Sequence, residues 1–345
     1  MNASALPGPA TNLQTWIAAR AKWHPAEIVF WLGCLLPLLP ASLLPGFLQK
    51  YWIFDSYLQL LSQIAITALF AISLDLILGY AGVVSLGHAA FFGLGAYAAG
   101  LIAKFWFTDP LLGLACAALL SGAIGFLASF VVLRFHGLAL IMITLGLGQL
   151  LAEGANSATW LTGGADGLQG IRAGKIFGTV EFDIFGQTAY IYALMVAFLL
   201  FLLSRRITNS PFGLSLQGIR DNSRRMLAIG APNQWHLRKV FTISAAMAGI
   251  AGALLTQTTQ TCSLETLTFQ RSADVLVILI LGGVGRLYGA IAGTIIYMIA
   301  RDFFSDVNPQ FWYFWIGLLL IGVVSYMPNG LLGGLNWLLL KWRRA

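Results

Sequence analysis

Charged residues are scarce in this chain, at 10% of its 345 residues, whereas hydrophobic residues make up 58%. A soluble domain carries about a quarter charged residues, so this composition excludes a soluble globular protein and a large soluble catalytic domain. One helical crossing of a bilayer needs about 20 apolar residues, so the length allows roughly eight to ten crossings. The predicted fold class is therefore an all-α polytopic integral membrane protein, with about nine or ten transmembrane segments.

The chain also lacks the common motifs of enzymes and nucleotide-binding proteins. It contains no phosphate-binding loop of the G-x-x-x-x-G-K-[ST] type, no H-E-x-x-H string and no G-x-S-x-G string. Its cysteines, Cys34, Cys116 and Cys262, show neither the spacing of a metal site nor a pattern of pairs. We therefore expect no catalytic residue, no metal site and no cofactor bound by this chain itself.

Ionisable residues are rare within the apolar runs, and Asp75 is the clearest of them. A carrier coupled to protons or sodium ions usually places several carboxylates or histidines along its path. Their scarcity indicates that the energy for any transport comes from outside this chain, and it disfavours an enzyme embedded in the membrane. A self-contained ion-coupled secondary transporter and an assembly scaffold without a transport role are the alternatives.

Apolar runs separated by polar turns predict the membrane segments. We expect these segments at about residues 28–48, 57–78, 89–105, 111–133, 138–152, 189–203, 240–256, 273–301 and 310–326. The run 273–301 is interrupted by glycines and is long for one crossing but short for two, and residues 331–340 are short for a crossing. The number of crossings after residue 273 and the side of the C-terminus are therefore left open.

Basic residues set the expected orientation and the domain boundaries. The segment 204–239 holds several arginines and a single acid, Asp221, and cytoplasmic loops are enriched in Lys and Arg. The net charge of +7 follows this pattern, so it does not indicate nucleic-acid binding. The expected parts are a cytoplasmic N-terminal extension (1–27), a transmembrane domain (28–340) with a periplasmic loop (153–188, hairpin-like at 175–185) and a cytoplasmic loop (204–239), and a basic C-terminal tail (341–345).

The stretch 74–100 contains a glycine-rich interruption between two apolar runs. Non-helical backbone is tolerated at membrane depth only where protein or a water-filled cavity satisfies its N–H and C=O groups. Residues 76–82 resemble residues 279–285, and glycine-interrupted segments in two halves of a chain are typical of paired broken helices at a transport site. Chance repetition in a leucine-rich chain is the alternative. The pathway candidates are Asp75, Gly79, Tyr80, Gly82, Ser85, His88, Gly282, Gly283 and Gly285.

Two of these candidates have more specific expected roles. Placing the charged side chain of Asp75 in lipid would cost free energy, so we expect it to face the protein interior. There it would hydrogen-bond the backbone groups freed at the glycines, with contact to substrate as the alternative. We expect His88 to cap or to hydrogen-bond at the start of the next helix, and not to bind a metal.

Small residues spaced by four predict close packing of helices. The expected faces are Ser85, Ala89 and Gly93, then Ala245, Gly249 and Ala253, and then Gly289 and Gly293.

A short amphipathic element is expected after Ser210. Ser210 and Pro211 are typical of a helix N-cap and first turn. Arg220, Arg224 and Arg225 would flank one apolar face, so the element could fit a groove on a partner protein, or lie on anionic lipid as an interfacial helix. The residues of that expected face are Leu214, Leu216, Ile219, Met226 and Leu227.

Four strings along the chain carry a resemblance to a known family. They are GYAG-x-x-SLGHAAF at residues 79–91, TGGADG at 162–167, SPFG at 210–213 with IRDN at 219–222, and GGVG at 282–285. In this order they resemble the permease subunits of branched-chain amino acid ABC transporters, of the LivM type, over about residues 57–334. The chain departs from the family pattern at Gly218 and at residues 223–225, which bears on the identity of the matching ATPases.

The resemblance implies a non-catalytic permease subunit for branched-chain or related apolar amino acids in a bacterial inner membrane. Its implied partners are a second related permease, two cytoplasmic subunits that bind ATP and Mg, and a periplasmic substrate-binding protein. Related permeases carry urea, amides or aromatic acids, so these substrates are alternatives. The residues implied in coupling to the ATPases are Ser210, Pro211, Phe212, Gly213, Ile219, Arg220, Asp221, Asn222 and Gly230. Candidates for docking the binding protein are Thr162, Gly163, Gly164 and Asp166.

Overall fold

The computed structural model describes residues 25–35, 37, 54–171, 174, 186–327, 330 and 331. The hairpin-like stretch and the basic tail lie outside these residues, as do nearly all of the N-terminal extension, most of the second half of the first predicted segment and nearly all of residues 331–340.

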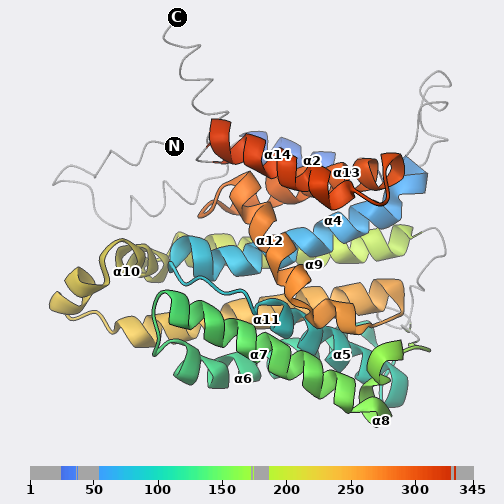
Figure 1. Ribbon diagram of the computed structural model, residues 1–345, viewed down its shortest axis with the longest axis horizontal. Coiled ribbons are helices and arrows are strands. Elements are labelled where there is room, and N and C mark those ends of the chain that lie inside the picture. The colour runs from blue at the N-terminus through green and yellow to red at the C-terminus, as the bar shows by residue number, and fades with distance from the viewer. Residues whose placement is uncertain are drawn as a thin grey trace, which may run out of the picture.

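Helices dominate the described part of the chain, which contains no strand and a single isolated bridge between Leu168 and Cys262. The long helices lie side by side, with α10 projecting at one end of the bundle and α8 lying at the other (Figure 1). The elements are α2 (Pro25–Gly33), α4 (Phe54–Asp75), η3 (Leu76–Tyr80), α5 (Ala89–Phe105), α6 (Pro110–Val132), α7 (Leu138–Ser157), α8 (Thr159–Thr162), η4 (Gly164–Asp166), α9 (Gln187–Thr208), α10 (Pro211–Ala228), α11 (Asn233–Thr259), η5 (Leu264–Leu267), α12 (Phe269–Gly282), α13 (Leu287–Val307) and α14 (Trp312–Tyr326).

Six helical stretches of the described residues are long and apolar enough to cross a membrane. They are residues 57–80 and helices α6, α7, α9, α11 and α13, and α5 and α14 are shorter apolar helices. This arrangement confirms the predicted all-α polytopic membrane fold.

Local sequence signals explain where several helices begin. The Asp109 side chain accepts a hydrogen bond from the Leu111 N–H at 3.0 Å, and Pro110 occupies the first helical position of α6. Ser210 does the same for α10, because its hydroxyl accepts from the Gly213 N–H at 3.3 Å. Both caps satisfy N–H groups that have no partner within a helix. The N-cap predicted at Ser210 is confirmed.

Helices α4 and α11 form the centre of the bundle, since they are the most buried of the long helices. Helix α11 packs directly on α5 through glycines. A Cβ atom on Gly95 would overlap backbone atoms of Gly249, and one on Gly252 would overlap the carbonyl group of Phe92. Small residues let membrane helices approach until their backbones touch. The close packing predicted for the face that contains Gly249 is confirmed.

Replacing Gly95 with alanine should therefore lower the melting temperature of the purified protein in detergent. The new methyl group would meet the backbone of Gly249, which cannot move aside as a flexible side chain could. Overpacking of this kind costs about 1–3 kcal/mol. Gly146→Ala is the matched control, because a Cβ atom there meets nothing within 4 Å. Equal melting temperatures for the two variants would contradict this account of the α5–α11 contact.

The described elements correct three details of the predicted segments. Helix α2 ends at Gly33 and a turn follows, so a continuous helix over 28–48 is wrong. Ser85 lies in the non-helical residues 81–88, so it does not share a helix face with Ala89. The polar segment 204–239 is mostly helical, because its amphipathic pattern supports α10 and its ends extend α9 and α11.

The run 273–301 divides at its glycines, as predicted. Helix α12 has 14 residues and α13 has 21. At 1.5 Å per residue, α12 is about 21 Å long, which is less than the hydrocarbon thickness of about 30 Å. Helix α12 is therefore too short for a full crossing, whereas α13 is long and apolar enough for one.

Candidate functional site

The first glycine interruption changes the helical geometry at the end of α4. The helix continues into a π-helical turn, η3, and residues 81–88 then leave the helix. The Val83 N–H donates to the Ile77 carbonyl at 2.9 Å, and Gly82 adopts a φ of 74°, which favours glycine. Single π-helical turns interrupt α-helices frequently at functional sites. The non-helical backbone predicted here is present.

The second interruption lies directly against the first. Between α12 and α13, Gly283 and Gly285 have φ values of 105° and 78°. The Gly285 N–H donates to Oδ1 of Asp75 at 2.7 Å, and a Cβ atom on Gly79 would lie 2.5 Å from the Gly285 nitrogen. The two similar strings are therefore in contact. Asp75 is fully buried and bonds the backbone of the second interruption, not that of its own.

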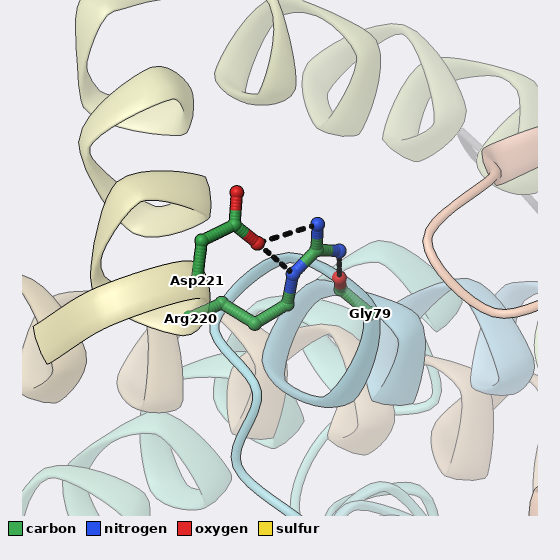
Figure 2. Close-up of polar contacts among 3 residues, drawn as sticks. All are labelled: Gly79, Arg220 and Asp221. Atoms are coloured by element: carbon green, nitrogen blue, oxygen red, sulfur yellow. Dashed lines mark hydrogen bonds and ion pairs between the residues drawn. The ribbon is translucent and has the colours of Figure 1, made fainter. Parts of the chain in front are cut away.

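Arg220 of α10 joins this junction from the polar segment 204–239 (Figure 2). Its Nη1 donates to the carbonyl oxygen of Gly79, and its Nε and Nη2 donate to Oδ1 of Asp221 at 3.2 and 3.1 Å. A Cβ atom on Gly82 would lie 2.7 Å from Cγ of Arg220, and one on Gly285 would lie 3.3 Å from its Nη1. One arginine therefore bonds the first glycine interruption and lies beside the second, which no single string of the sequence indicates.

Helix α10 consists of two parts that differ in burial. Asn222 has non-helical angles (φ −157°, ψ 93°), and its Oδ1 accepts from the Arg225 N–H at 2.9 Å, so a second short helix begins there. Leu216 and Ile219, before the kink, are buried against the rest of the chain, whereas Leu227 after it is 58% exposed. The single apolar face predicted for this element is therefore wrong, because the kink directs the two parts differently.

The other residues predicted for coupling hold α10 in place. A Cβ atom on Gly213 would lie 2.6 Å from the Ile207 carbonyl oxygen, so only glycine fits the turn from α9 into α10. Phe212 stacks on His236 of α11 with ring centres 5.5 Å apart. Gly230, with a φ of 84°, lies in the turn after the second part. These contacts anchor the first part of α10 and leave the second part at the surface.

Ser85 and His88 lie inside the chain, at the end of the extended residues. The His88 ring stacks on Phe70 with centres 5.6 Å apart, and its Nε2 lies 3.0 Å from Oγ of Ser73. His88 precedes α5 but its side chain makes no cap, and the described residues contain no cluster that could hold a metal. Ser85 and His88 are each 1% exposed, so both side chains are enclosed by the chain in this structure.

Of the other pathway candidates, Gly82 is exposed, Tyr80 and Gly285 are half-buried, and Gly79, Gly282 and Gly283 are buried. The candidate surface at this junction is therefore small, and the buried glycines let its segments approach closely.

The loop at the opposite end of the bundle is held by Thr162. Its hydroxyl lies within 2.9 Å of the Ala155 and Ala158 carbonyls, and the Gly164 N–H bonds it at 3.2 Å. Gly163 and Gly164 have positive φ values of 79° and 60°. These residues build the turn, whereas Asp166 is exposed beside them. Among the four docking candidates, Asp166 is the charged side chain that a partner could reach.

Two ionisable residues on α12 were not predicted from the sequence as site residues. Arg271 and Asp274 lie on a helix that begins at Phe269, earlier than the predicted segment 273–301. When a predicted segment is started at the first residue of its apolar run, charged residues in the first turn of the helix fall outside the segment or at its edge. The signal that could have found them is the amphipathic spacing of Arg271, Asp274 and the apolar residues that follow.

Comparisons with known proteins find matches over most of the chain. A family model described as branched-chain amino acid transport system / permease component matches residues 56–324. The high-affinity branched-chain amino acid transport system permease protein LivM of Salmonella typhimurium is 31% identical over 290 residues, and that of Escherichia coli is 30% identical over 283. The probable branched-chain amino acid transport permease protein LivM of Methanocaldococcus jannaschii is 24% identical over 311 residues.

Each of these alignments covers 76% of this chain. They cover 66% of the Salmonella and Escherichia proteins and 89% of the Methanocaldococcus protein, so this chain spans 66% of the length of the first two relatives. No solved structure matches the chain.

Proposed function

This chain belongs to the family of permease components of branched-chain amino acid transport systems, and from this premise we propose that it is one membrane subunit of an ABC importer. Its cargo is a branched-chain or related apolar amino acid, in keeping with the names of its relatives. The translocation path lies between this chain and a second, related permease in a bacterial inner membrane. Two cytoplasmic subunits bind ATP with Mg, and this chain has no catalytic residue of its own.

The hydrogen bond from Arg220 to the Gly79 carbonyl is the observation that carries the mechanism. ATP binding and hydrolysis on the partner subunits move α10, and Arg220 passes that movement to both glycine interruptions at once. Helix α4 then changes its position relative to α12 and α13, because Asp75 and Gly285 join them. Alternation of this junction between two arrangements opens the path to one side of the membrane and then to the other.

The surface of the second part of α10 supports its role as the docking element. Leu227 and Ile229 are 58% and 72% exposed, and Arg224 and Arg225 are exposed beside them. Exposed apolar side chains next to arginines fit an apolar groove with an acidic rim on a partner protein. This surface would face the cytoplasm.

A periplasmic binding protein would dock at the opposite end. Helix α8 and the turn that contains Asp166 lie at the end of the bundle away from α10 (Figure 1). Helix α10 and the turn that contains Asp166 therefore lie at opposite ends of the bundle. A cytoplasmic partner could dock at the first and a periplasmic partner at the second. Asp166 would pair with a basic residue on the binding protein.

Uptake of radiolabelled leucine into proteoliposomes tests the proposal. The vesicles should contain this chain, its partner permease and both ATPase subunits, with binding protein outside and ATP with Mg inside. We expect uptake that needs all of these components and that stops when ATP is replaced by a non-hydrolysable analogue. Vesicles that contain only this chain are the control, and uptake by them, driven by an ion gradient and indifferent to ATP, would refute the importer.

A further inference from the structure

Two arginines on α12 and α13 lie over aromatic rings, and neither has a carboxylate within ion-pair distance among the residues that the structure describes. The guanidinium of Arg271 on α12 is 5.5 Å from the centre of the Phe92 ring, and that of Arg301 on α13 is 5.2 Å from the centre of the Trp312 ring. Both arginines are half-buried. The faces of aromatic rings attract cations, but they do not satisfy the hydrogen-bond donors of a guanidinium.

Acidic groups lie near these arginines without pairing with them. Among the described residues, ion pairs within 4.0 Å join Arg205 to Glu27 and Arg220 to Asp221, and none involves Arg271 or Arg301. The electrostatic neighbours of Arg271 include Arg301, Asp274 and Glu265. Asp274 accepts a hydrogen bond from Nε2 of Gln270 at 3.2 Å. A charged side chain in a membrane segment normally pairs with an opposite charge or lines a water-filled cavity. Within the described part of the chain, neither arginine has such an anionic partner.

The position of Arg271 connects it with the non-helical segment. The next residue, Ser272, accepts a hydrogen bond from the Ala89 N–H at 2.9 Å, which joins the start of α12 to the start of α5. Phe92, beneath the guanidinium, lies in the first turns of α5. Arg271 therefore stands where residues 81–88 end inside the bundle.

We propose that Arg271 and Asp274 bind the zwitterionic head group of the transported amino acid, the guanidinium taking the α-carboxylate and the Asp274 carboxylate taking the α-ammonium. The proposal rests on the proposed function. Residues three apart share a helix face, so both side chains can meet one small ligand. A guanidinium binds a carboxylate through two parallel hydrogen bonds, and Arg301 adds a second positive charge nearby.

Leucine uptake by the complete complex, reconstituted in phosphatidylcholine vesicles, tests this site. Removing a charge-assisted hydrogen bond costs about 1.5–3 kcal/mol, so Arg271→Gln should reduce uptake about tenfold to a hundredfold. Arg271→Lys should retain part of the uptake, because lysine keeps the charge but not the paired donors. Asp274→Asn should raise the KM for leucine about tenfold. Arg134→Gln is the matched control, since Arg134 is exposed in the turn between α6 and α7.

A second measurement separates binding from assembly. The ATPase activity stimulated by loaded binding protein should stay within about twofold of wild type in the Arg271 and Asp274 variants, because docking and coupling lie elsewhere. Uptake by Arg271→Gln within about twofold of wild type would overturn the proposal. If that variant fails to assemble, unchanged uptake by both Arg271→Lys and Asp274→Asn would overturn it.

Two further outcomes separate the sources of error. A loss of uptake in Arg271→Gln that appears only in vesicles with anionic lipid would assign Arg271 to a lipid phosphate, and would overturn a substrate role. Failure of the wild-type complex to import leucine would refute the proposed function and this inference with it. Wild-type import together with an unimpaired Arg271→Gln variant would refute the inference alone.

Discussion

Replacing Arg220 with alanine should nearly abolish ATP-driven uptake while the transporter still assembles. The substitution removes the hydrogen bond to Gly79 and the contacts with Gly82 and Gly285, so movement of α10 no longer reaches the glycine interruptions. The lost charge-assisted bond alone is worth about 1.5–3 kcal/mol, which corresponds to about a tenfold to hundredfold loss. Leucine uptake and ATP hydrolysis should be measured in the same vesicles, and hydrolysis should continue without transport.

The control for this variant is Arg206→Ala. Arg206 is an exposed arginine in the last turn of α9, close to α10 in the sequence, so its loss removes the same charge from the same loop segment. We expect uptake by Arg206→Ala to remain near that of wild type. The exchange of Arg220→Glu with Asp221→Lys should fail to restore uptake, since a lysine at 221 starts from a different position on the helix and lacks the planar donors. Normal ATPase association and normal uptake in the exchanged variant would contradict the proposed role of Arg220 in coupling.

The second large effect is expected at Asp75. In Asp75→Ala the N–H of the half-buried Gly285 loses its acceptor, and leaving a buried donor unsatisfied costs about 1–3 kcal/mol. Helix α4 would also lose its direct bond to the second interruption, so both the melting temperature and the yield of assembled complex should fall. Thermal unfolding in detergent, monitored by size-exclusion chromatography, measures both.

Asp75→Asn distinguishes the bond from the charge. Asparagine keeps an oxygen in the position of Oδ1, so the Gly285 bond should survive, while the negative charge disappears. We expect this variant to melt near the wild-type temperature and to retain much of its uptake. If Asp75→Asn lost as much melting temperature and uptake as Asp75→Ala, the negative charge of Asp75 would be the property that the site requires.

Much of the fold could be predicted from the sequence, because hydrophobic runs of fixed length leave few alternatives in a bilayer. The break before Leu287, the N-cap at Ser210 and the interior position of Asp75 all followed from residue chemistry. The end of α2 at Gly33 did not, because the apolar run continues past it and only packing decides where a helix stops.

The candidate site was predictable in its parts but not in its assembly. The similarity of residues 76–82 and 279–285 indicated a pair of interruptions, and the structure places them in contact. The link to Arg220 joins residues that are 141 positions apart, and no local pattern encodes such a distance. The kink at Asn222 was also missed, since a single residue with extended angles leaves the helical spacing on either side intact.

The backbone contact between α5 and α11 has a mechanical consequence. Two helices whose main chains are already in contact at Gly95 and Gly249 cannot approach each other further. They also cannot slide past each other unless the distance between them increases. During any transport cycle they should therefore move as one solid block. The conformational change that such a cycle needs must then occur at the two glycine interruptions. These would act as hinges between helices that move as rigid bodies.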